Sequence, residues 1–177
     1  LFLNEAAPPG MAGGGLKHAF IGQLLITFFA VLIGVPLGIL GGPYLAEYGR
    51  HRPIGRFIST LSDIMISVPS IVPGTFVYAL FVTPIGHFSG YAGSLALAII
   101  MIPVVLRTTE EMISLVPWEI REAAFALGAP YYKVILQVVY RGAATGIFTG
   151  TLLAIARIAG ETAPLLFTSF NNMFSTT

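Results

Sequence analysis

The stretch FIGQLLITFFAVLIGVPLGILGGPYLA, residues 20–46, has no charged side chain and exceeds the about 20 apolar residues that a helix needs to cross a bilayer. Within lipid every backbone amide and carbonyl must be hydrogen-bonded inside the protein, so a long apolar run favours a transmembrane helix. Pro36 and Pro43 interrupt the run, and we expect kinks there. This stretch therefore predicts an all-α membrane protein.

The composition of the whole chain agrees with a membrane protein. Hydrophobic residues make up 55% of the 177 residues and charged residues only 10%, whereas charged residues are roughly a quarter of a soluble domain. The net charge is +1, and no basic stripe is large enough to bind a nucleic-acid backbone. The chain has no Cys, and its three histidines, at 18, 51 and 87, stand apart from one another. We therefore expect no nucleic-acid partner, no metal site and no cofactor.

Further apolar runs follow at residues 57–82, about 92–106 and about 142–159, and apolar character resumes after Pro164. The second run contains SVPSIVPG, residues 67–74, whose prolines predict further kinks. The third run is expected to continue as a helix through residues 107–116. Together the runs predict one domain over residues 1–177, a polytopic transmembrane bundle of about four to five helices.

Lys and Arg are unevenly distributed between the loops, and basic residues concentrate on the cytoplasmic side of membrane proteins. Residues 47–56 contain three arginines and residues 107–141 contain four basic residues, whereas residues 83–91 contain neither Lys nor Arg. This pattern places residues 47–56 and 107–141 in the cytoplasm. It places residues 83–91 and the region after Glu161 outside.

The cytoplasmic segment PWEIREAAFALGAP, residues 117–130, has the pattern of a short helix. Pro117 suits the first helical position, and Gly128 followed by Pro130 is a strong stop signal. A helix with two usable faces has room for two contacts, one with this chain and one with a cytosolic partner. The alternative is an amphipathic connector that lies on lipid head groups.

The two faces of this segment differ in chemistry. One face carries apolar residues spaced i, i+3, i+4 and i+7, namely Ile120, Ala123, Ala124 and Leu127. The other face carries Trp118, Arg121, Glu122 and Phe125. We expect the apolar face to pack on the ends of the chain's own spans and the aromatic and ionic face to point into the cytosol.

The residues EAAFALG, 122–128, resemble the EAA loop of bacterial ABC importer permeases, where Glu-Ala-Ala and a following Gly mark the coupling helix. The matching residues here are Glu122, Ala123, Ala124 and Gly128. The resemblance implies that Arg121 and Glu122 meet an ATPase and that Gly128 permits a tight exit turn. Further along, the family's Ile-x-Leu-Pro is replaced by Val138, Tyr140 and Arg141.

Other segments extend the resemblance over nearly the whole chain. PLGILGGPYLAEY, SVPSIVPG, RTTEEMISLVPWEIREAAFALGA and ARIAGETAPLLF look like successive segments of permeases from phosphate ABC importers. The resemblance implies the ABC importer permease (MetI-like) fold, a bacterial or archaeal plasma membrane, and phosphate import. It also implies three partners: a second permease, a cytoplasmic ATPase dimer and an extracytoplasmic phosphate-binding protein. Permeases of that family have more spans, so we expect this chain to be the central part, without the first and last helices.

No energy source for transport occurs in the sequence. None of the 20 Gly begins a Gly-x-x-x-x-Gly-Lys-[Ser/Thr] phosphate loop, and no catalytic set of polar residues lies within the apolar runs. We therefore predict a permease without enzymatic activity, driven by ATP hydrolysis on a separate chain that grips residues 117–130. The alternatives are a permease for another oxyanion, such as sulfate or molybdate, and a secondary transporter or channel.

Arg157 and Glu161 are spaced i, i+4 near the outer end of the last long run, so they are close enough to pair. Arg157 shares roughly the face of a small-residue row, Gly142, Gly146, Gly150 and Ala154. We therefore expect Arg157 to point into the bundle and, with Glu161, to line an anion pathway. The alternative is that Arg157 snorkels to the outer surface.

Thr162 and Pro164 indicate a broken helix whose freed groups contact the substrate, or else an ordinary kink at a helix end. Gly34 and Gly38 are expected to serve helix packing. Asp63 is expected at the membrane interface. Adjacent carboxylates at 110 and 111 lie on different sides of a helix, and we expect them to be solvated.

Overall fold

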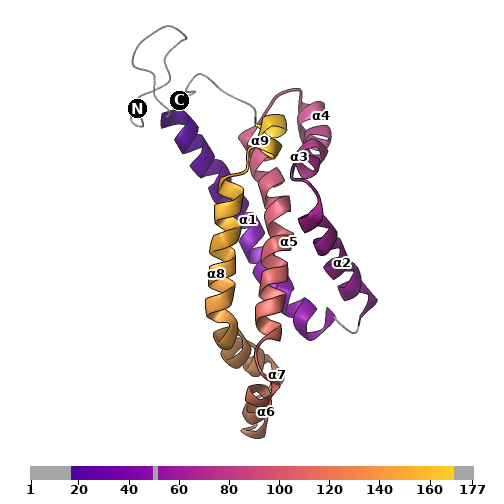
Figure 1. The fold of residues 1–177 in the computed structure, drawn as a ribbon, viewed down its shortest axis with the longest axis vertical. Coiled ribbons are helices and arrows are strands. Elements are labelled where there is room, and N and C mark those ends of the chain that lie inside the picture. The colour runs from indigo at the N-terminus through magenta and orange to yellow at the C-terminus, as the bar shows by residue number, and fades with distance from the viewer. Residues whose placement is uncertain (1–16, 50–51, 170–177) are drawn as a thin grey trace.

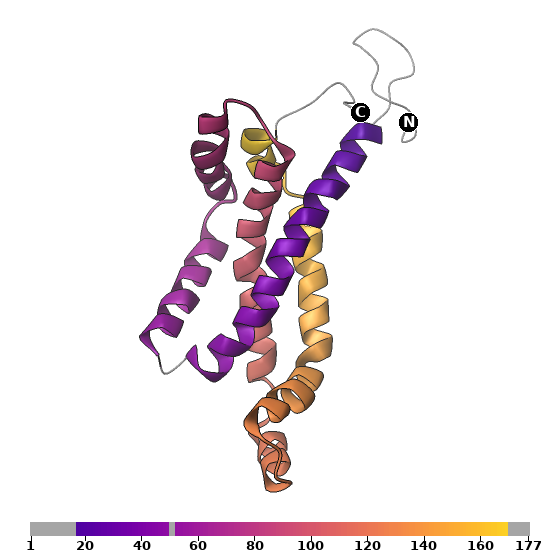
Figure 2. The same ribbon diagram turned by 180° about the vertical axis from the view of Figure 1, so that it is seen from behind.

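The computed structural model of the protein describes residues 17–49 and 52–169. The elements in this part are α1 (Lys17–Glu47), α2 (Pro53–Ser67), α3 (Ile71–Val77), the π-helical segment η2 (Tyr78–Val82), α4 (Thr83–Ile85), α5 (Gly90–Ser114), α6 (Trp118–Ala126), α7 (Tyr131–Lys133), the π-helical segment η3 (Val134–Val139), α8 (Tyr140–Ala159) and α9 (Ala163–Thr168). No strand occurs among the described residues, so the all-α prediction is confirmed. Figures 1 and 2 show α1, α5 and α8 as the long helices of a bundle, with α6 and α7 beyond one end of it.

Three helical stretches are long and apolar enough to cross a membrane: Ala19–Glu47, Gly90–Ser114 and Tyr131–Ala159. The last of these joins α7, η3 and α8. A fourth span is formed by α2 with α3 and η2 if that bent pair counts as one. The described residues therefore hold three candidate spans, fewer than the predicted four to five, or four if the bent pair counts as one span.

The apolar run at residues 57–82 is broken rather than kinked. α2 ends at Ser67, α3 begins at Ile71, and the two segments meet at 107°. Val68 between them is extended, with φ −75° and ψ 138°. Pro69 explains this conformation, because the residue before a proline avoids the helical region. The expected kink is thus corrected to a sharp break.

α1 stays helical through Pro36 and Pro43, although each proline removes one backbone donor. The donor missing at Pro43 would have bonded to the carbonyl of Ile39, four residues earlier. The hydroxyl of Tyr140 donates a hydrogen bond to this carbonyl at 3.0 Å. Tyr140, one of the positions that differ from the family pattern, thus supplies the donor that Pro43 lacks and ties α8 to α1.

Glycines let α5 approach α1 and α8 closely. A Cβ added at Gly38 on α1 would lie 2.6 Å from the Cβ of Val105 on α5. A Cβ added at Gly150 on α8 would overlap the Cγ2 of Thr108 on α5. The packing role predicted for the small residues of α1 and α8 is therefore confirmed, and α5 is the helix against which both are packed.

The connections lie at the two ends of the bundle that the charge pattern predicts. α6 and α7, within residues 107–141, lie at one end, and the end of α1 contacts them there (Figure 1). α4, within residues 83–91, and α9, which follows Glu161, lie at the opposite end. The identity of the first end as cytoplasmic stays a prediction from its positive charge.

Replacing Tyr140 with Phe removes the donor for the carbonyl of Ile39. An unsatisfied polar group in an apolar interior costs about 1 to 3 kcal/mol, so Tyr140→Phe should lower the thermal unfolding midpoint of the purified protein in detergent. Tyr132→Phe is the matched control, because Tyr132 is exposed. Equal midpoints for the two variants would show that this hydrogen bond does not hold α8 to α1.

Replacing Gly38 with Ala places a methyl group against Val105 and forces α1 away from α5. Overpacking of this kind costs about 1 to 3 kcal/mol, which the same unfolding measurement detects. Gly22→Ala on the same helix is the control, because nothing lies within 4 Å of a Cβ added there. A Gly38→Ala midpoint no lower than that of Gly22→Ala would rule out the close packing of α1 on α5.

Candidate functional site

The structure confirms the predicted inward position of Ala124 and outward positions of Trp118 and Glu122, but it corrects the rest of the predicted orientation of α6. Arg121, expected to face the cytosol, is buried with 7% exposure, whereas Ile120 and Leu127, expected to pack inward, are 50% and 89% exposed. Ala124 and Phe125 join Arg121 on the inner face, where they pack on a cluster that includes Ile113, Val116 and Val134. The apolar spacing therefore indicated a helix correctly, but of the residues it assigned to the inner face only Ala124 packs inward.

The reason for this orientation is an ion pair with a distant residue. Arg121 donates from Nη1 to the carboxylate of Glu47, near the end of α1, and from Nη2 to the carbonyl of Ile113 in α5 at 3.0 Å. Tyr131 of α7 donates from its hydroxyl to the other oxygen of Glu47 at 2.8 Å. A buried charge requires such a partner, and Arg121 finds it only by facing inward.

The outer face of α6 is apolar and aromatic with two exposed carboxylates. Glu122 is exposed and accepts a hydrogen bond from Nε1 of Trp118 at 2.7 Å. Ala123 is exposed beside it. The predicted exit turn is present, since Gly128 has φ +79°, in the left-handed region that favours glycine. Glu122, Ala123 and Gly128 are therefore accessible to a partner, whereas Arg121 is not.

At the other end of the bundle the break before α3 meets the break before α9. Glu161 lies in the second break and accepts a hydrogen bond from the hydroxyl of Ser70, in the first break, at 3.0 Å. A Cβ added at Gly74 would lie 2.6 Å from the Cα of Pro164, so the backbones touch. Ser70 was not among the predicted site residues. Its signal was the presence of two proline-interrupted runs, a feature typical of substrate sites in transporters.

Arg157 lies beside this meeting point but not inside the packed bundle. Its Nε is 3.9 Å from Oε1 of Glu161, so the predicted i, i+4 pair is present but loose. The side chain of Arg157 is 46% exposed, whereas its neighbour Ile158 is 1% exposed. Ile158 takes the inward position that was expected for Arg157, because the packed face of α8 runs from Ala154 to Ile158. Arg157 therefore stands on an open side of this chain.

Thr162 is exposed and precedes α9 without forming a side-chain cap. The structure thus brings Arg157 and Glu161 together. Thr162 directly follows Glu161, in the break between α8 and α9.

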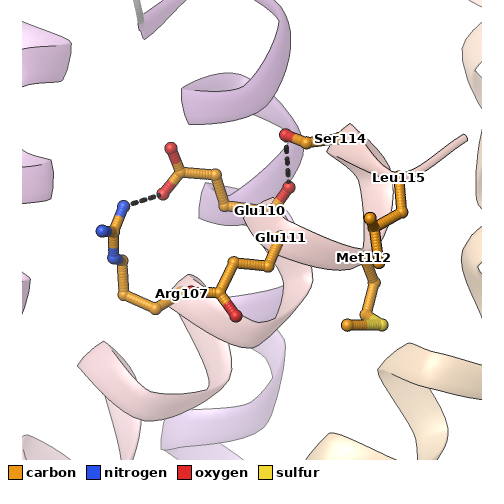
Figure 3. Close-up of a pocket in the computed structure, with 6 residues that line it drawn as sticks. All are labelled: Arg107, Glu110, Glu111, Met112, Ser114 and Leu115. Carbon is orange, nitrogen blue, oxygen red and sulfur yellow. Dashed lines mark hydrogen bonds and ion pairs between the residues drawn. The ribbon is translucent and has the colours of Figure 1, made fainter.

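A shallow hollow of about 450 Å³ lies against the end of α5 nearest α6 (Figure 3). Its lining residues belong to α5 and to the residue directly after it: Arg107, Glu110, Glu111, Met112, Ser114 and Leu115. Arg107 pairs with Glu110 at 2.7 Å and with Asp63 of α2 at 2.8 Å. Because two carboxylates already surround its guanidinium, this hollow is poorly suited to an anion.

The Arg107 pair also corrects one expectation. Glu110, expected to be solvated, is buried with 7% exposure, since Arg107 and the neighbouring helices cover it. Glu111 is exposed as expected, and Asp63 is exposed as well. Arg107 therefore pins α2 to α5.

Among the described residues no group of three His, Cys, Asp or Glu side chains lies close enough to bind a metal ion. His87 is exposed. His51 lies outside the described residues, so the prediction that concerns it is not tested.

The sequence matches a family model described as "Binding-protein-dependent transport system inner membrane component" over residues 34–177. It is 53% identical over 175 residues to the phosphate transport system permease protein PstA of Pasteurella multocida, a match that covers 99% of this chain and 62% of that protein. It is 52% identical over 177 residues to PstA of Yersinia pestis, covering 100% of this chain and 60% of that one. The chain thus spans less than two thirds of the length of these relatives.

A relative is also found in an archaeon. A protein of Methanocaldococcus jannaschii named "Probable phosphate transport system permease protein PstA" is 45% identical over 159 residues, covering 90% of this chain and 56% of that protein. Among solved structures, an inward-facing MetNI methionine ABC transporter matches with a TM-score of 0.69 at 20% identity, covering 88% of this chain and 73% of that chain. At this identity the likeness shows the fold, which is the predicted ABC importer permease type.

The orientation of α6 predicts different reactivity for two adjacent alanines. Ala123 is exposed and Ala124 packs on the inner cluster, so Ala123→Cys should react with a membrane-impermeant maleimide several times faster than Ala124→Cys. The sequence has no Cys, so the single labels are unambiguous within these residues. Inside-out membrane vesicles should label and right-side-out vesicles should not. Labelling of Ala124→Cys that is as fast as that of Ala123→Cys, or faster, would contradict the orientation of α6 in the structure.

Proposed function

Because the chain belongs to the family of binding-protein-dependent transport system inner membrane components, we propose that it forms part of the membrane path of an ATP-driven phosphate importer. The observation that carries the proposal is the identity of 53% over nearly the whole chain to a phosphate transport system permease. The apolar helices and the MetNI-like fold agree with a multi-pass membrane permease. In the proposed importer this chain pairs with a second permease and receives phosphate from an extracytoplasmic binding protein.

ATP hydrolysis takes place on a separate cytoplasmic ATPase dimer in this proposal. The sequence has no phosphate loop of its own, and α6 stands beyond the ends of the long helices, where a cytosolic protein can reach it. The exposed groups that meet the ATPase are Glu122, Ala123 and the apolar side chains of Ile120 and Leu127. Arg121 does not touch the ATPase in this proposal and instead holds α6 in place from its inner face.

Arg157 is the proposed anion-binding group of the path. It faces an open side of this chain, where a second permease would enclose it, and its contact with Glu161 at 3.9 Å is loose enough to be displaced. Ser70 keeps hold of Glu161 through the other carboxylate oxygen, at 3.0 Å. A passing phosphate then replaces Glu161 as the partner of Arg157, and the exposed hydroxyl of Thr162 is available to the same anion.

The proposal is tested by uptake of radiolabelled phosphate into proteoliposomes that contain the complete transporter. We expect uptake only with hydrolysable ATP and loaded binding protein, and we expect sulfate and molybdate to compete weakly. Equal competition by either oxyanion would overturn phosphate as the substrate. Uptake that is indifferent to ATP would favour a secondary transporter or channel.

Replacing Arg157 with Gln should lower phosphate uptake by at least about tenfold while the complex still assembles. Hydrogen bonds to charged groups contribute about 1.5 to 3 kcal/mol, and about 1.4 kcal/mol is a factor of ten. Arg141→Gln, an exposed arginine near the other end of α8, is the control for loss of one positive charge. Near-normal uptake by the Arg157→Gln transporter would exclude Arg157 from the path.

A further inference from the structure

Glu47, Arg121 and Tyr131, here called the base cluster, join three helices and the end of a fourth at one point. Glu47 comes from α1, Arg121 from α6 and Tyr131 from α7, and Arg121 also bonds to the carbonyl of Ile113 in α5. We propose that the base cluster is a positioning element that makes α6 move together with α1 and α5, so that force applied to α6 reaches the transmembrane helices. This inference rests on the proposed function.

The burial of the ion pair is the first support. The side chains of Glu47 and Arg121 are only 7% and 9% exposed, although both stand at the end of the bundle where water is close. Removing two charges from water is costly, and a buried pair adds little net stability compared with an apolar pair of similar volume. What a buried pair does supply is one defined geometry, because either charge without its partner is strongly unfavourable. The base cluster therefore fixes the position of α6 relative to α1.

The geometry of the guanidinium is the second support. One terminal nitrogen of Arg121 bonds to α1 and the other bonds to α5, a two-way contact that suits the rigid fork of arginine and not the single ammonium of lysine. Besides this contact, α6 is joined to α5 and α7 through short turns and through the packing of Ala124 and Phe125. Arg121 thus holds α6 directly to α1 and to α5.

A line of aromatic rings adds a parallel connection. Phe125 of α6 stacks on Tyr131 with ring centroids 6.0 Å apart, and Tyr131 meets Tyr48, directly after α1, edge-on at 6.0 Å. Tyr131 therefore contacts α6 through its ring and α1 through both its ring and its hydroxyl. The two connections leave α6 little freedom to tilt without moving the end of α1.

The test is the number of phosphate ions taken up per ATP hydrolysed by the complete transporter in proteoliposomes. In the Glu47→Gln variant we expect this ratio to fall by about five- to tenfold, an effect of the size that is typical for coupling between two distant sites. The ATPase should still co-purify with this variant. A role in stability alone would leave the ratio unchanged, because fewer folded complexes lower uptake and hydrolysis together. Glu111→Gln is the matched control, since Glu111 is an exposed carboxylate near the end of α5 that bonds to Arg121.

A second variant covers the case in which Glu47→Gln fails to assemble. Tyr131→Phe keeps the ion pair and both ring contacts but removes the hydroxyl that holds Glu47, so it should lower the ratio about twofold. If the Glu47→Gln transporter assembles and has the wild-type ratio of phosphate to ATP, the inference is overturned while the proposed function stands. If Glu47→Gln does not assemble, a wild-type ratio in Tyr131→Phe has the same consequence. If the wild-type transporter shows no ATP-driven phosphate uptake, the proposed function fails and the inference fails with it.

Discussion

The close approach of α5 to α1 and α8 is the constraint on which the rest of the structure depends. Lipid tails are as apolar as leucine, so helices in a membrane gain little from apolar burial alone and associate through tight packing of small residues. Gly38 on α1 and Gly150 on α8 leave room for the side chains of Val105 and Thr108 on α5. Because α5 packs tightly on both α1 and α8, the segments at the ends of these three helices are held in defined positions relative to one another.

Two polar sites lie at opposite ends of the bundle formed by α1, α5 and α8. The base cluster fixes α6 at one end, and the pair of Arg157 and Glu161 stands at the other, where the breaks before α3 and α9 meet. The two sites differ in a way that suits different tasks. The Glu47 and Arg121 pair is buried and tight, as a mechanical connection requires, whereas the Arg157 and Glu161 pair is loose and half exposed, as an exchangeable contact requires.

The sequence predicted what depends on local pattern and missed what depends on distant partners. The long spans, the short helix α6 and the left-handed turn at Gly128 follow from apolar runs, proline and glycine, which act within a few residues. Arg121 was assigned to the wrong face of α6 because its partner is Glu47, which lies 74 residues earlier in the chain. Ser70 was missed for the same reason, since its partner Glu161 is 91 residues away.

In the proposed transporter, α6 and the helices packed on α5 move as one body when the ATPase acts. Spin labels on Ala123→Cys in α6 and Thr149→Cys in α8, both exposed positions, report the distance along this body by pulsed electron paramagnetic resonance. In the complete transporter the distance distribution should be the same without nucleotide and with bound ATP. A shift larger than the width of the distribution would show that α6 moves independently of the bundle and would contradict the account.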